Sequence, residues 1–172
     1  MTLLYLVRHG ETIDNVHRIM QGQTQGKLND NGIKQAEDVA EKLKAEPINA
    51  FIASDLRRSI HTCEIIAAPH HQPVCITPLL RERDWGAFTG KYIPDLSNLK
   101  NPALWPKDIE SIDAIKARAA EFIAWLRTEY PNQKVLAVGH GIINKAIQSV
   151  YYDKPMNEIL PMSNAEIRML EL

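Results

Sequence analysis

The sequence predicts a single three-layer α/β domain, in which a mostly parallel sheet is covered by helices on both faces. Three observations support this fold class. Short continuous apolar runs, typical of strands buried on both faces, alternate with stretches of helical periodicity. The 172 residues match the size of one domain. Their composition, 45% hydrophobic and 24% charged, is that of an ordinary folded chain.

The first strand and the first long helix are predicted in the N-terminal part. Leu3–Val7 is a short apolar run that ends at Arg8 and indicates a buried strand. After a polar loop an amphipathic helix is expected, because apolar residues recur there at helical spacing: Ile33, Ala36, Val39, Ala40 and Leu43. Residues 29–31, all Asn or Asp, are the candidates for its N-cap, and Pro47 lies beyond its end.

Two further strands are expected on either side of a second helix. Ala50–Ala53 is an apolar run, and Ser54 and Asp55 follow it as the expected caps of a helix that continues to Ala67. Val74–Thr77 is the next expected strand. This order of strand, helix and strand is typical of a parallel sheet.

The C-terminal part continues the alternation. Apolar residues at helical spacing from Ile112 to Leu126, behind Ser111 as the N-cap, predict a strongly amphipathic helix. Val135–Val138 is another buried strand, and a helix is expected over residues 142–151. Polar and apolar residues alternate over residues 166–169, as they do in an edge strand.

A stretch without regular pattern separates the two halves. Three prolines lie between Pro94 and Pro106, so this stretch is predicted to be a loop that crosses the surface. Long loops of this kind often cover sites. Within the single domain of residues 1–172, we therefore expect a cap or substrate loop around residues 85–110.

Charge and apolar content exclude several classes of protein. The chain has 20 Lys and Arg residues and 21 Asp and Glu residues, so its net charge is −1. A chain with this charge has no general electrostatic attraction to nucleic acid or to an anionic membrane. The first apolar run has five residues before Arg8, too few for a signal peptide or a membrane span. We expect a cytoplasmic protein with no nucleic-acid or membrane partner, whose anion site is built locally.

Basic side chains and glycines follow the ends of three predicted strands. Arg8, His9 and Gly10 follow the first strand. His140 and Gly141 follow a later one, and an Asp-Leu-Arg-Arg run follows a third. Ligands of open α/β sheets bind beyond the carboxyl ends of the strands, so we expect these residues to meet. Arginine matches phosphate oxygens through a planar fork of donors, and this set therefore fits a tetrahedral dianion.

Four motifs stand in order along nearly the whole chain. They are LVRHGET (Leu6–Thr12), SDLRRSIHT (Ser54–Thr62), LRERDWGAFTG (Leu80–Gly90) and VGHG (Val138–Gly141). Together they resemble the motifs of the histidine phosphatase superfamily, which has the phosphoglycerate-mutase-like fold. The resemblance implies a phosphatase, a phosphoric monoester hydrolase, that acts on a small phosphorylated metabolite.

The resemblance implies covalent catalysis by two of the residues in these motifs. His9 would attack phosphorus and form a phosphohistidine. Glu82 would protonate the leaving oxygen and then take a proton from the water that hydrolyses the intermediate. The resemblance also implies that His140 contributes to catalysis. We expect His9 to be neutral, because it has to attack, and His140 to be protonated, because it would then add positive charge.

The resemblance implies that the phosphoryl oxygens are held by Arg8, Arg58 and His140. Asn15 would add a further phosphate contact, and Gly141 would let the backbone approach the anion. Two guanidinium groups can replace the magnesium ion common in phosphoryl transfer. We therefore expect no cofactor and no metal site.

Some positions leave alternatives open. Many relatives carry Asp and then Pro before the leucine of the first long loop, where Gln25 and Lys27 stand here, so the conformation of this loop is open. Trp85, Phe88 and Tyr92 either form a wall of the substrate pocket or belong to the core.

Two other functions compete with a phosphatase. Mutases of the family usually have extra segments that exclude water, whereas the segment between Gly90 and Ser111 is short, which favours hydrolysis. A module that only binds phosphorylated ligands would need no general acid, yet Glu82 is present. The identity of the substrate and the oligomeric state are left open by the sequence.

Overall fold

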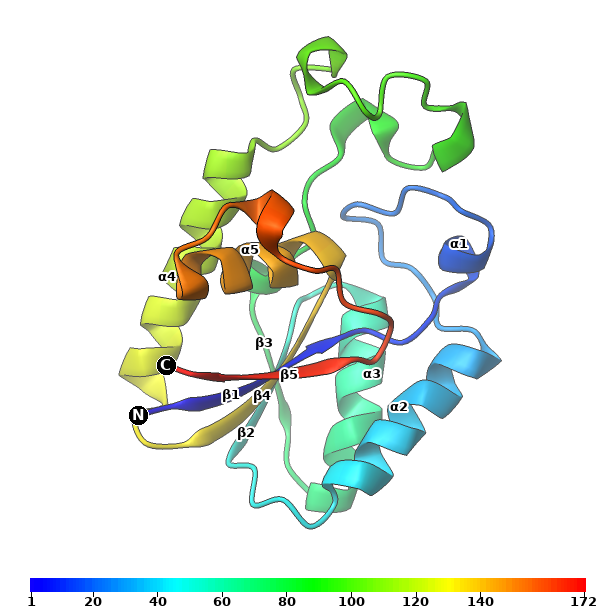
Figure 1. Ribbon diagram of the computed structural model, residues 1–172. Coiled ribbons are helices and arrows are strands. Elements are labelled where there is room, and N and C mark those ends of the chain that lie inside the picture. The colour runs from blue at the N-terminus through cyan, green and yellow to red at the C-terminus, as the bar shows by residue number, and fades with distance from the viewer.

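A five-stranded sheet forms the centre of the protein in a computed structural model that describes residues 1–172 (Figure 1). The strands follow the order β3-β2-β4-β1-β5 across the sheet. Their bounds are β1 (Leu3–Arg8), β2 (Ala50–Ala53), β3 (Val74–Ile76), β4 (Lys134–Gly139) and β5 (Ile167–Glu171). Strands β1 to β4 are mutually parallel and β5 runs antiparallel to β1 at the edge. The predicted mostly parallel sheet and its C-terminal edge strand are confirmed.

Two pairs of helices cover the two faces of this sheet (Figure 1). Helices α2 (Asp30–Leu43) and α3 (Arg57–Ala67) pack on one face, and α4 (Ile112–Glu129) and α5 (Gly141–Tyr152) pack on the other. Side chains along a strand alternate between faces. In β1, accordingly, Leu4 joins the core under α4 and α5, whereas Tyr5 joins the core under α2 and α3. The predicted three layers are confirmed.

The register of the sheet brings the ends of three strands to one edge. Arg8 of β1 pairs with Gly139 of β4, so the next residues, His9 and His140, leave neighbouring strands at the same level. On the other side of β4, Ala53 of β2 pairs with Val138. The sequence segments expected to bear the site thus leave the sheet side by side.

Two of the predicted helix caps are confirmed. The Asn29 side chain accepts a hydrogen bond from the backbone N–H of Gly32 at the start of α2. The Ser111 hydroxyl likewise accepts one from the backbone N–H of Ala114 at the start of α4. Each bond satisfies an N–H that has no partner within its helix.

The predicted cap of α3 is wrong. The residue at the N-cap position is Leu56, which has no side chain able to accept a hydrogen bond. The Ser54 hydroxyl lies 2.7 Å from Nε2 of His140, and the Asp55 carboxylate pairs with the Arg81 guanidinium at 2.5 Å. Both side chains have long-range partners, which a search for local caps does not consider.

The segment of residues 85–110 forms the top of the molecule in Figure 1, away from the sheet. It contains no α-helix or strand but three short 3-10 turns, Gly86–Phe88, Ile93–Asp95 and Pro102–Leu104. Its apolar side chains form a small cluster together with Met20 from the loop after α1, and the buried residues of this cluster are separate from the two cores beside the sheet. The four-residue helix α1 (Ile13–Val16) lies in the loop after β1.

No helix in the structure combines the length and the apolar character needed to cross a membrane.

Candidate active site

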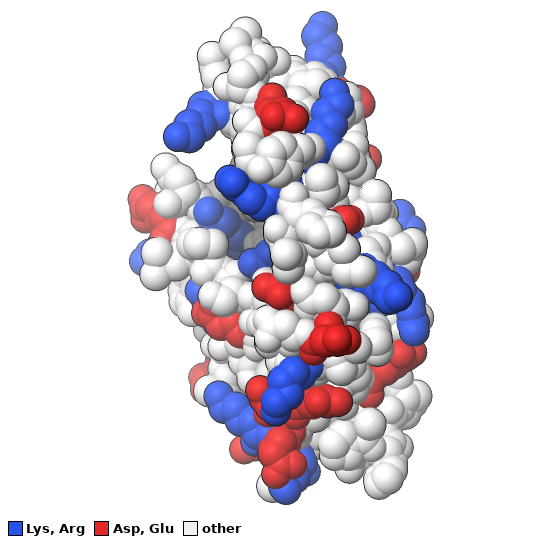
Figure 2. All heavy atoms as spheres, turned by 90° about the vertical axis from the view of Figure 1, so that its right-hand side faces the viewer, with Lys and Arg blue, Asp and Glu red and all other residues white.

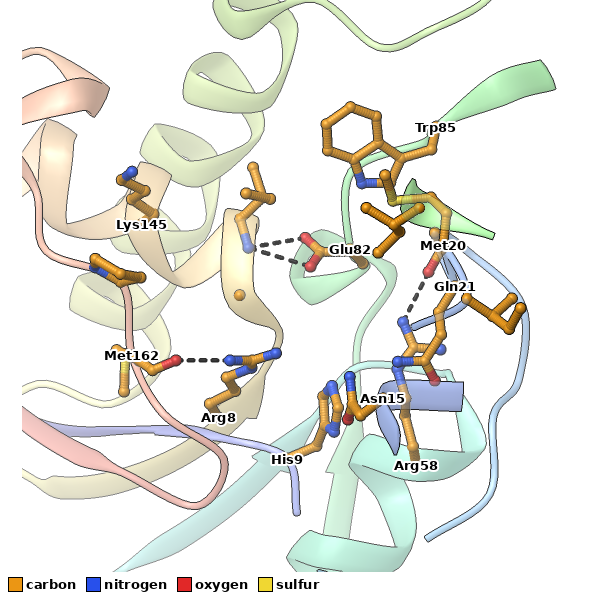
Figure 3. Close-up of a pocket in the computed structure, with 16 residues that line it drawn as sticks. Arg8, His9, Asn15, Met20, Gln21, Arg58, Glu82, Trp85, Lys145 and Met162 are labelled. Carbon is orange, nitrogen blue, oxygen red and sulfur yellow. Dashed lines mark hydrogen bonds between the residues drawn. The ribbon is translucent and has the colours of Figure 1, made fainter. Parts of the chain in front are cut away.

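A cavity of about 280 Å³ lies at the sheet edge where β1, β2 and β4 end. Six of the seven predicted site residues line it: Arg8, His9, Asn15, Arg58, Glu82 and Gly141 (Figure 3). The seventh, His140, is fully buried, with its ring centroid 5.1 Å from that of His9. On the face shown in Figure 2, Lys and Arg side chains gather around a hollow below the 85–110 segment. The structure thus brings the predicted set together.

The His9 ring is held in one tautomer. Its Nδ1 lies 2.7 Å from the carbonyl oxygen of Gly10, which can only accept a hydrogen bond. Nδ1 therefore carries the proton, and Nε2 keeps its lone pair. Burial, together with the charges of Arg58 and Arg8, lowers the pKa of His9 well below its ordinary value of 6.5. The ring is neutral at physiological pH, as the sequence led us to expect.

The pKa of His140 is also lowered well below 6.5, first by burial and then by Arg58, His9 and Arg8. The expectation that His140 is protonated while His9 is neutral is therefore wrong for the protein without an anion. A third positive charge in this buried position, close to two arginines, would be energetically unfavourable. The Nδ1 atom of His140 is buried and has no hydrogen-bond partner.

Each of the two arginines has an Nε–H group that bonds no other part of the protein. Arg8 donates from Nη1 to the carbonyl oxygen of Met162 at 2.7 Å, and Arg58 donates from Nη2 to that of Gly22 at 2.7 Å and from Nη1 to that of Thr24. The Nε atoms of both are buried without a partner. Burial lowers the pKa of Arg58 to about 10, so the group stays charged at neutral pH. Both guanidinium groups are thus fixed in place with an unused N–H.

Glu82 is held by the first turn of α5. Its carboxylate accepts hydrogen bonds from the backbone N–H groups of Ile142 and Ile143, each at 3.1 Å, and from that of Arg83 at 2.8 Å. The three backbone donors therefore fix the position and orientation of the Glu82 carboxyl group. The side chain is only 9% exposed and lines the cavity.

Arg118 of α4 holds the segment that carries Glu82. Its guanidinium donates to the carbonyl oxygens of Arg81 at 2.6 Å and Leu79 at 3.1 Å, and it forms an ion pair with Glu110 at 2.8 Å. Glu110 stands at the end of the 85–110 segment. One side chain therefore joins α4, the chain beside Glu82 and the base of that segment.

The two glycines of the histidine motifs differ in their surroundings. A Cβ on Gly10 would overlap the carbonyl oxygen of Gly32, at the start of α2. A Cβ on Gly141 would lie 3.7 Å from both the Arg8 guanidinium and the Glu82 carboxylate, which is an ordinary contact distance. Gly10 is required for close packing of two backbone segments, whereas Gly141 leaves space open between two polar groups of the cavity.

Asn15 has a structural role as well as a place in the cavity. It forms a capping box with Thr12 at the start of α1, in which each backbone N–H bonds the other side chain at 3.0 Å. Asn164 donates to the same amide oxygen at 3.3 Å. The oxygen of the Asn15 side chain is thereby used, and its NH₂ group remains for a ligand.

The three aromatic residues left unassigned from the sequence separate into different roles. Trp85 lines the cavity, Phe88 is buried in the cluster of the 85–110 segment, and Tyr92 is 43% exposed. Trp105 packs edge-on against Trp85, with ring centroids 5.4 Å apart, and the Arg83 guanidinium lies over both rings. Of Trp85, Phe88 and Tyr92, only Trp85 contributes to the site.

Gln25 supplies the cap that α3 lacks. Its side-chain oxygen accepts a hydrogen bond from the backbone N–H of Arg57 at 2.9 Å, and its carbonyl oxygen accepts one from the N–H of Arg58 at 3.1 Å. The loop at this position is therefore tied to the helix that carries Arg58. The backbone oxygen of Lys27 accepts from Ile13 and joins the loop to α1.

Sequence reasoning missed two polar side chains in the cavity. Gln21 reaches it from the loop after α1 and accepts a hydrogen bond from the Thr12 hydroxyl at 2.9 Å. Lys145 reaches it from α5. Residues four apart share a helix face, so the position of Lys145 relative to Gly141 was a usable signal. Nothing comparable in the sequence indicates Gln21.

Comparisons with known proteins agree with this geometry. The family model of the histidine phosphatase superfamily (branch 1) matches residues 4–172. An uncharacterized phosphatase, PhoE of Bacillus subtilis, is 33% identical over 141 residues, covering 82% of this chain and 72% of that protein. A probable phosphoglycerate mutase, GpmB of Proteus mirabilis, is 41% identical over 109 residues, which is 63% of this chain but half of that protein.

Among solved structures, a mycobacterial glucosyl-3-phosphoglycerate phosphatase superposes with a TM-score of 0.89 at 26% identity, covering 98% of this chain and 92% of that one. The similarity in fold therefore extends over nearly the whole chain.

Proposed function

The chain belongs to the histidine phosphatase superfamily and is an enzyme of that family, and we propose that it hydrolyses small phosphomonoesters through a phosphohistidine on His9. One observation carries the proposal. The neutral His9 ring, with its Nδ1 proton fixed on Gly10, lines a small cavity beside two charged guanidinium groups that each keep a free Nε–H.

The phosphoryl group binds at the sheet edge in this proposal. Arg8 and Arg58 donate from Nε to its oxygens, and Asn15 donates from its amide NH₂. The buried Nδ1 of His140, which has no protein partner, is the fourth donor. A bound dianion favours the protonated form of a nearby imidazole, so the charge on His140 arrives with the substrate.

In the first step Nε2 of His9 attacks phosphorus. The bond from phosphorus to the ester oxygen breaks, and Glu82 gives a proton to that oxygen as it leaves as an alcohol. The two arginines stabilise the negative charge of the three remaining phosphoryl oxygens. This stabilisation is the main requirement of phosphoryl transfer. The hydrogen bond from Nδ1 to Gly10 stabilises the ring as it becomes positive.

In the second step water attacks the phosphorus of the phosphohistidine. Glu82, now a carboxylate, takes the proton of that water, and the bond from nitrogen to phosphorus breaks. His9 and Glu82 return to their initial states, and inorganic phosphate leaves. One carboxyl group serves both steps because the leaving alcohol and the entering water occupy the same side of the phosphorus.

The 85–110 segment acts as the cap of the cavity in this proposal. Trp85 and Met20 belong to its apolar cluster, and both line the cavity. They supply an apolar wall for the alcohol part of the substrate, beyond the residues that hold the phosphoryl group.

The proposal is tested by trapping the intermediate. Wild-type protein mixed with phosphate-labelled p-nitrophenyl phosphate and then quenched should carry acid-labile, alkali-stable label on the peptide that contains His9. His9→Ala should carry none and should lose at least about 10³-fold in turnover, because the covalent route is closed. His71→Asn, a change at an exposed histidine outside the cavity, is the control. Equal turnover by His9→Ala and wild type would refute the mechanism.

A mutase activity is the second candidate, because the Proteus mirabilis relative is named a probable phosphoglycerate mutase. A mutase returns the phosphoryl group from histidine to another hydroxyl of the substrate. Phosphoenzyme should be incubated with and without 3-phosphoglycerate. We expect release of inorganic phosphate to dominate, and isomerisation much faster than this release would replace hydrolysis by mutase activity.

A further inference from the structure

A second cavity, of about 430 Å³, lies where the 85–110 segment meets the start of α4. Trp105 and Lys107 of the segment line it, as do Ser111 and Ile112 at the start of the helix, and Arg83 completes its wall. None of the residues that line it also lines the catalytic cavity. The proposed phosphoryl chemistry therefore does not use this second cavity.

Arg83 supplies a buried guanidinium whose outer edge is unused. The residue is only 6% exposed, and its Nε donates to the carbonyl oxygen of Glu110 at 2.7 Å. The guanidinium carbon lies 4.7 Å and 5.1 Å from the ring centroids of Trp85 and Trp105. No carboxylate oxygen lies within 4.0 Å of the group, and neither Nη atom donates a hydrogen bond within the protein. The two Nη atoms of a fixed guanidinium are thus available to a ligand in the cavity.

The start of α4 adds donors of another kind. The Ser111 hydroxyl accepts a hydrogen bond from the N–H of Ala114, and the backbone N–H groups of Ile112 and Asp113 have no partner in the protein. Free N–H groups in the first turn of a helix bind oxyanions. Lys107 contributes an ammonium that also has no carboxylate within 4.0 Å.

The acidic residues beside the cavity do not neutralise it from within. Asp108, Glu110 and Asp113 are close in sequence, but none of them lines the cavity. The Glu110 carboxylate is paired with Arg118 at 2.8 Å, and the Asp108 carboxylate lies against Gly86. The lining thus contains two cations and no acid.

We propose that this cavity is a second anion site, which binds the phosphate group of a small molecule through Arg83, Lys107 and the first turn of α4. A tetrahedral dianion has enough oxygens to bond the guanidinium fork, the ammonium and the helix N–H groups together. The cavity contains neither a histidine nor a carboxylic acid, so we assign it binding and no turnover.

A ligand in this site would also act on the catalytic cavity. Arg83 and Trp105 both contact Trp85, which lines that cavity. The bound anion would join Arg83 and the 85–110 segment to α4. Because a ligand that binds only the folded form stabilises it, occupancy should slow the local opening of the segment.

The test follows binding residue by residue, so that the two cavities are distinguished. Inorganic phosphate is titrated into ¹⁵N-labelled protein at constant ionic strength, with sodium chloride as the baseline. We expect the backbone N–H signals of Ile112 and Asp113 and the indole N–H of Trp105 to shift along one saturation curve. The N–H of Gly141 reports on the catalytic cavity and should follow a different curve.

Two variants assign the first curve to the proposed site. Arg83→Gln should weaken phosphate binding there at least about 10-fold, because a charged, bidentate donor is lost. Lys107→Gln, at an exposed position, should weaken it about 3-fold and leave the curve of Gly141 unchanged. Lys100→Gln is the matched control: it removes an exposed charge from the same segment outside the cavity and should keep both curves.

A second titration with phenylphosphonate identifies the source of the phosphate group. Tighter binding of phenylphosphonate than of inorganic phosphate assigns the site to a phosphorylated organic molecule, whose apolar part packs on Trp105. Equal or weaker binding assigns it to free phosphate. Absence of shifts at Ile112, Asp113 and Trp105, or shifts that neither Arg83→Gln nor Lys107→Gln weakens, would overturn the second site. Neither result would affect the proposed hydrolysis at His9, which the phosphohistidine experiment tests separately.

Discussion

The two sides of the cavity are built in different ways. The phosphate end consists of side chains at the ends of sheet strands and at the starts of α3 and α5, and His9, Arg58 and His140 are no more than 2% exposed there. The opposite wall comes from the 85–110 segment, which has only short 3-10 turns. Its cluster contains three buried residues, against 16 and 12 in the two cores beside the sheet.

This difference separates the chemistry from the recognition of the alcohol. At the phosphate end most of the side chains are held by backbone partners, such as Gly10 for His9 and Ile142 for Glu82. Fixed donors need no rearrangement during phosphoryl transfer. Few apolar side chains of the 85–110 segment are buried. Local unfolding of such a region costs little free energy. We therefore expect changes in the first region to affect kcat and changes in the second to affect substrate range.

Apart from the loss of His9 itself, the largest effect should follow from Arg58→Ala. Loss of this charge should lower kcat/KM by about 10² to 10³, or roughly 3 to 4 kcal/mol, as for a lost oxyanion donor. It also leaves the carbonyl oxygens of Gly22 and Thr24 without a donor, so urea unfolding should show lower stability. Arg57→Ala, which removes an exposed neighbour, is the control. A loss of only a few-fold in Arg58→Ala would contradict our account of the phosphate end.

A smaller and selective effect is expected from Glu82→Gln. The amide cannot donate a proton as a carboxylic acid does, so an alkyl phosphate should lose about 10²-fold in kcat. Because p-nitrophenol leaves without a proton, its phosphate should lose only a few-fold. Glu121→Gln, at an exposed position of α4, should leave both rates unchanged. Equal losses for the two substrates would remove Glu82 from the proton transfers.

Between pH 5 and 7.5, stability should depend on pH through the two buried histidines of the phosphate end. His9 and His140 are neutral when folded, with a pKa well below 6.5, but take up protons near 6.5 when unfolded. The free energy of unfolding should therefore fall as the pH drops below 6.5, by up to about 1.4 kcal/mol per pH unit for each histidine.

Urea unfolding between pH 7.5 and 5 measures this dependence. The double variant His9→Gln and His140→Gln should show a flatter profile than wild type. Added inorganic phosphate should flatten the wild-type profile, because a bound anion favours proton uptake by His140 in the folded state. Identical slopes in wild type and the double variant would show that other groups cause the acid sensitivity.

The smallest effect on overall stability is expected from Trp105→Ala. Its ring contacts Trp85 and Arg83 but lies outside both cores beside the sheet. Amide hydrogen exchange should become faster in residues 85–110 and stay unchanged in β1 and β4. We expect KM to rise several-fold with little change in kcat. Faster exchange in the strands as well would mean that the segment belongs to the cooperative core.

The sequence was sufficient to predict the phosphate end because its residues follow strands directly. Once β1 and β4 were predicted as parallel strands, His9 and His140 had to leave the sheet at the same edge, and the observed register places them at the same level. The motif resemblance selected Arg58 and Glu82 from among neighbouring charged residues. All four long helices were also predicted, α2 and α4 from the helical spacing of their apolar residues.

What the sequence could not show depends on contacts between distant segments. Gln25 caps α3 from 32 residues away, and Arg118 bonds Arg81 and Glu110 from a different helix. Serine is a residue type that often caps helices, but the Ser54 hydroxyl is hydrogen-bonded to His140. None of these partners follows from local propensity or spacing. The protonation of His140 was predicted wrongly for a similar reason, since its burial is a property of the folded site.

The contrast between Gly10 and Gly141 has a consequence for directed evolution. In a library screened only for soluble, folded protein, Gly10 and Gly32 should both be recovered as glycine, because a methyl group at either overlaps neighbouring backbone. Alanine at 141 should pass that screen, since its methyl group meets only ordinary contacts. A screen for turnover should reject it, because the methyl group occupies the space between Arg8 and Glu82. The two glycines would thus be retained under different selections, one for folding and the other for catalysis.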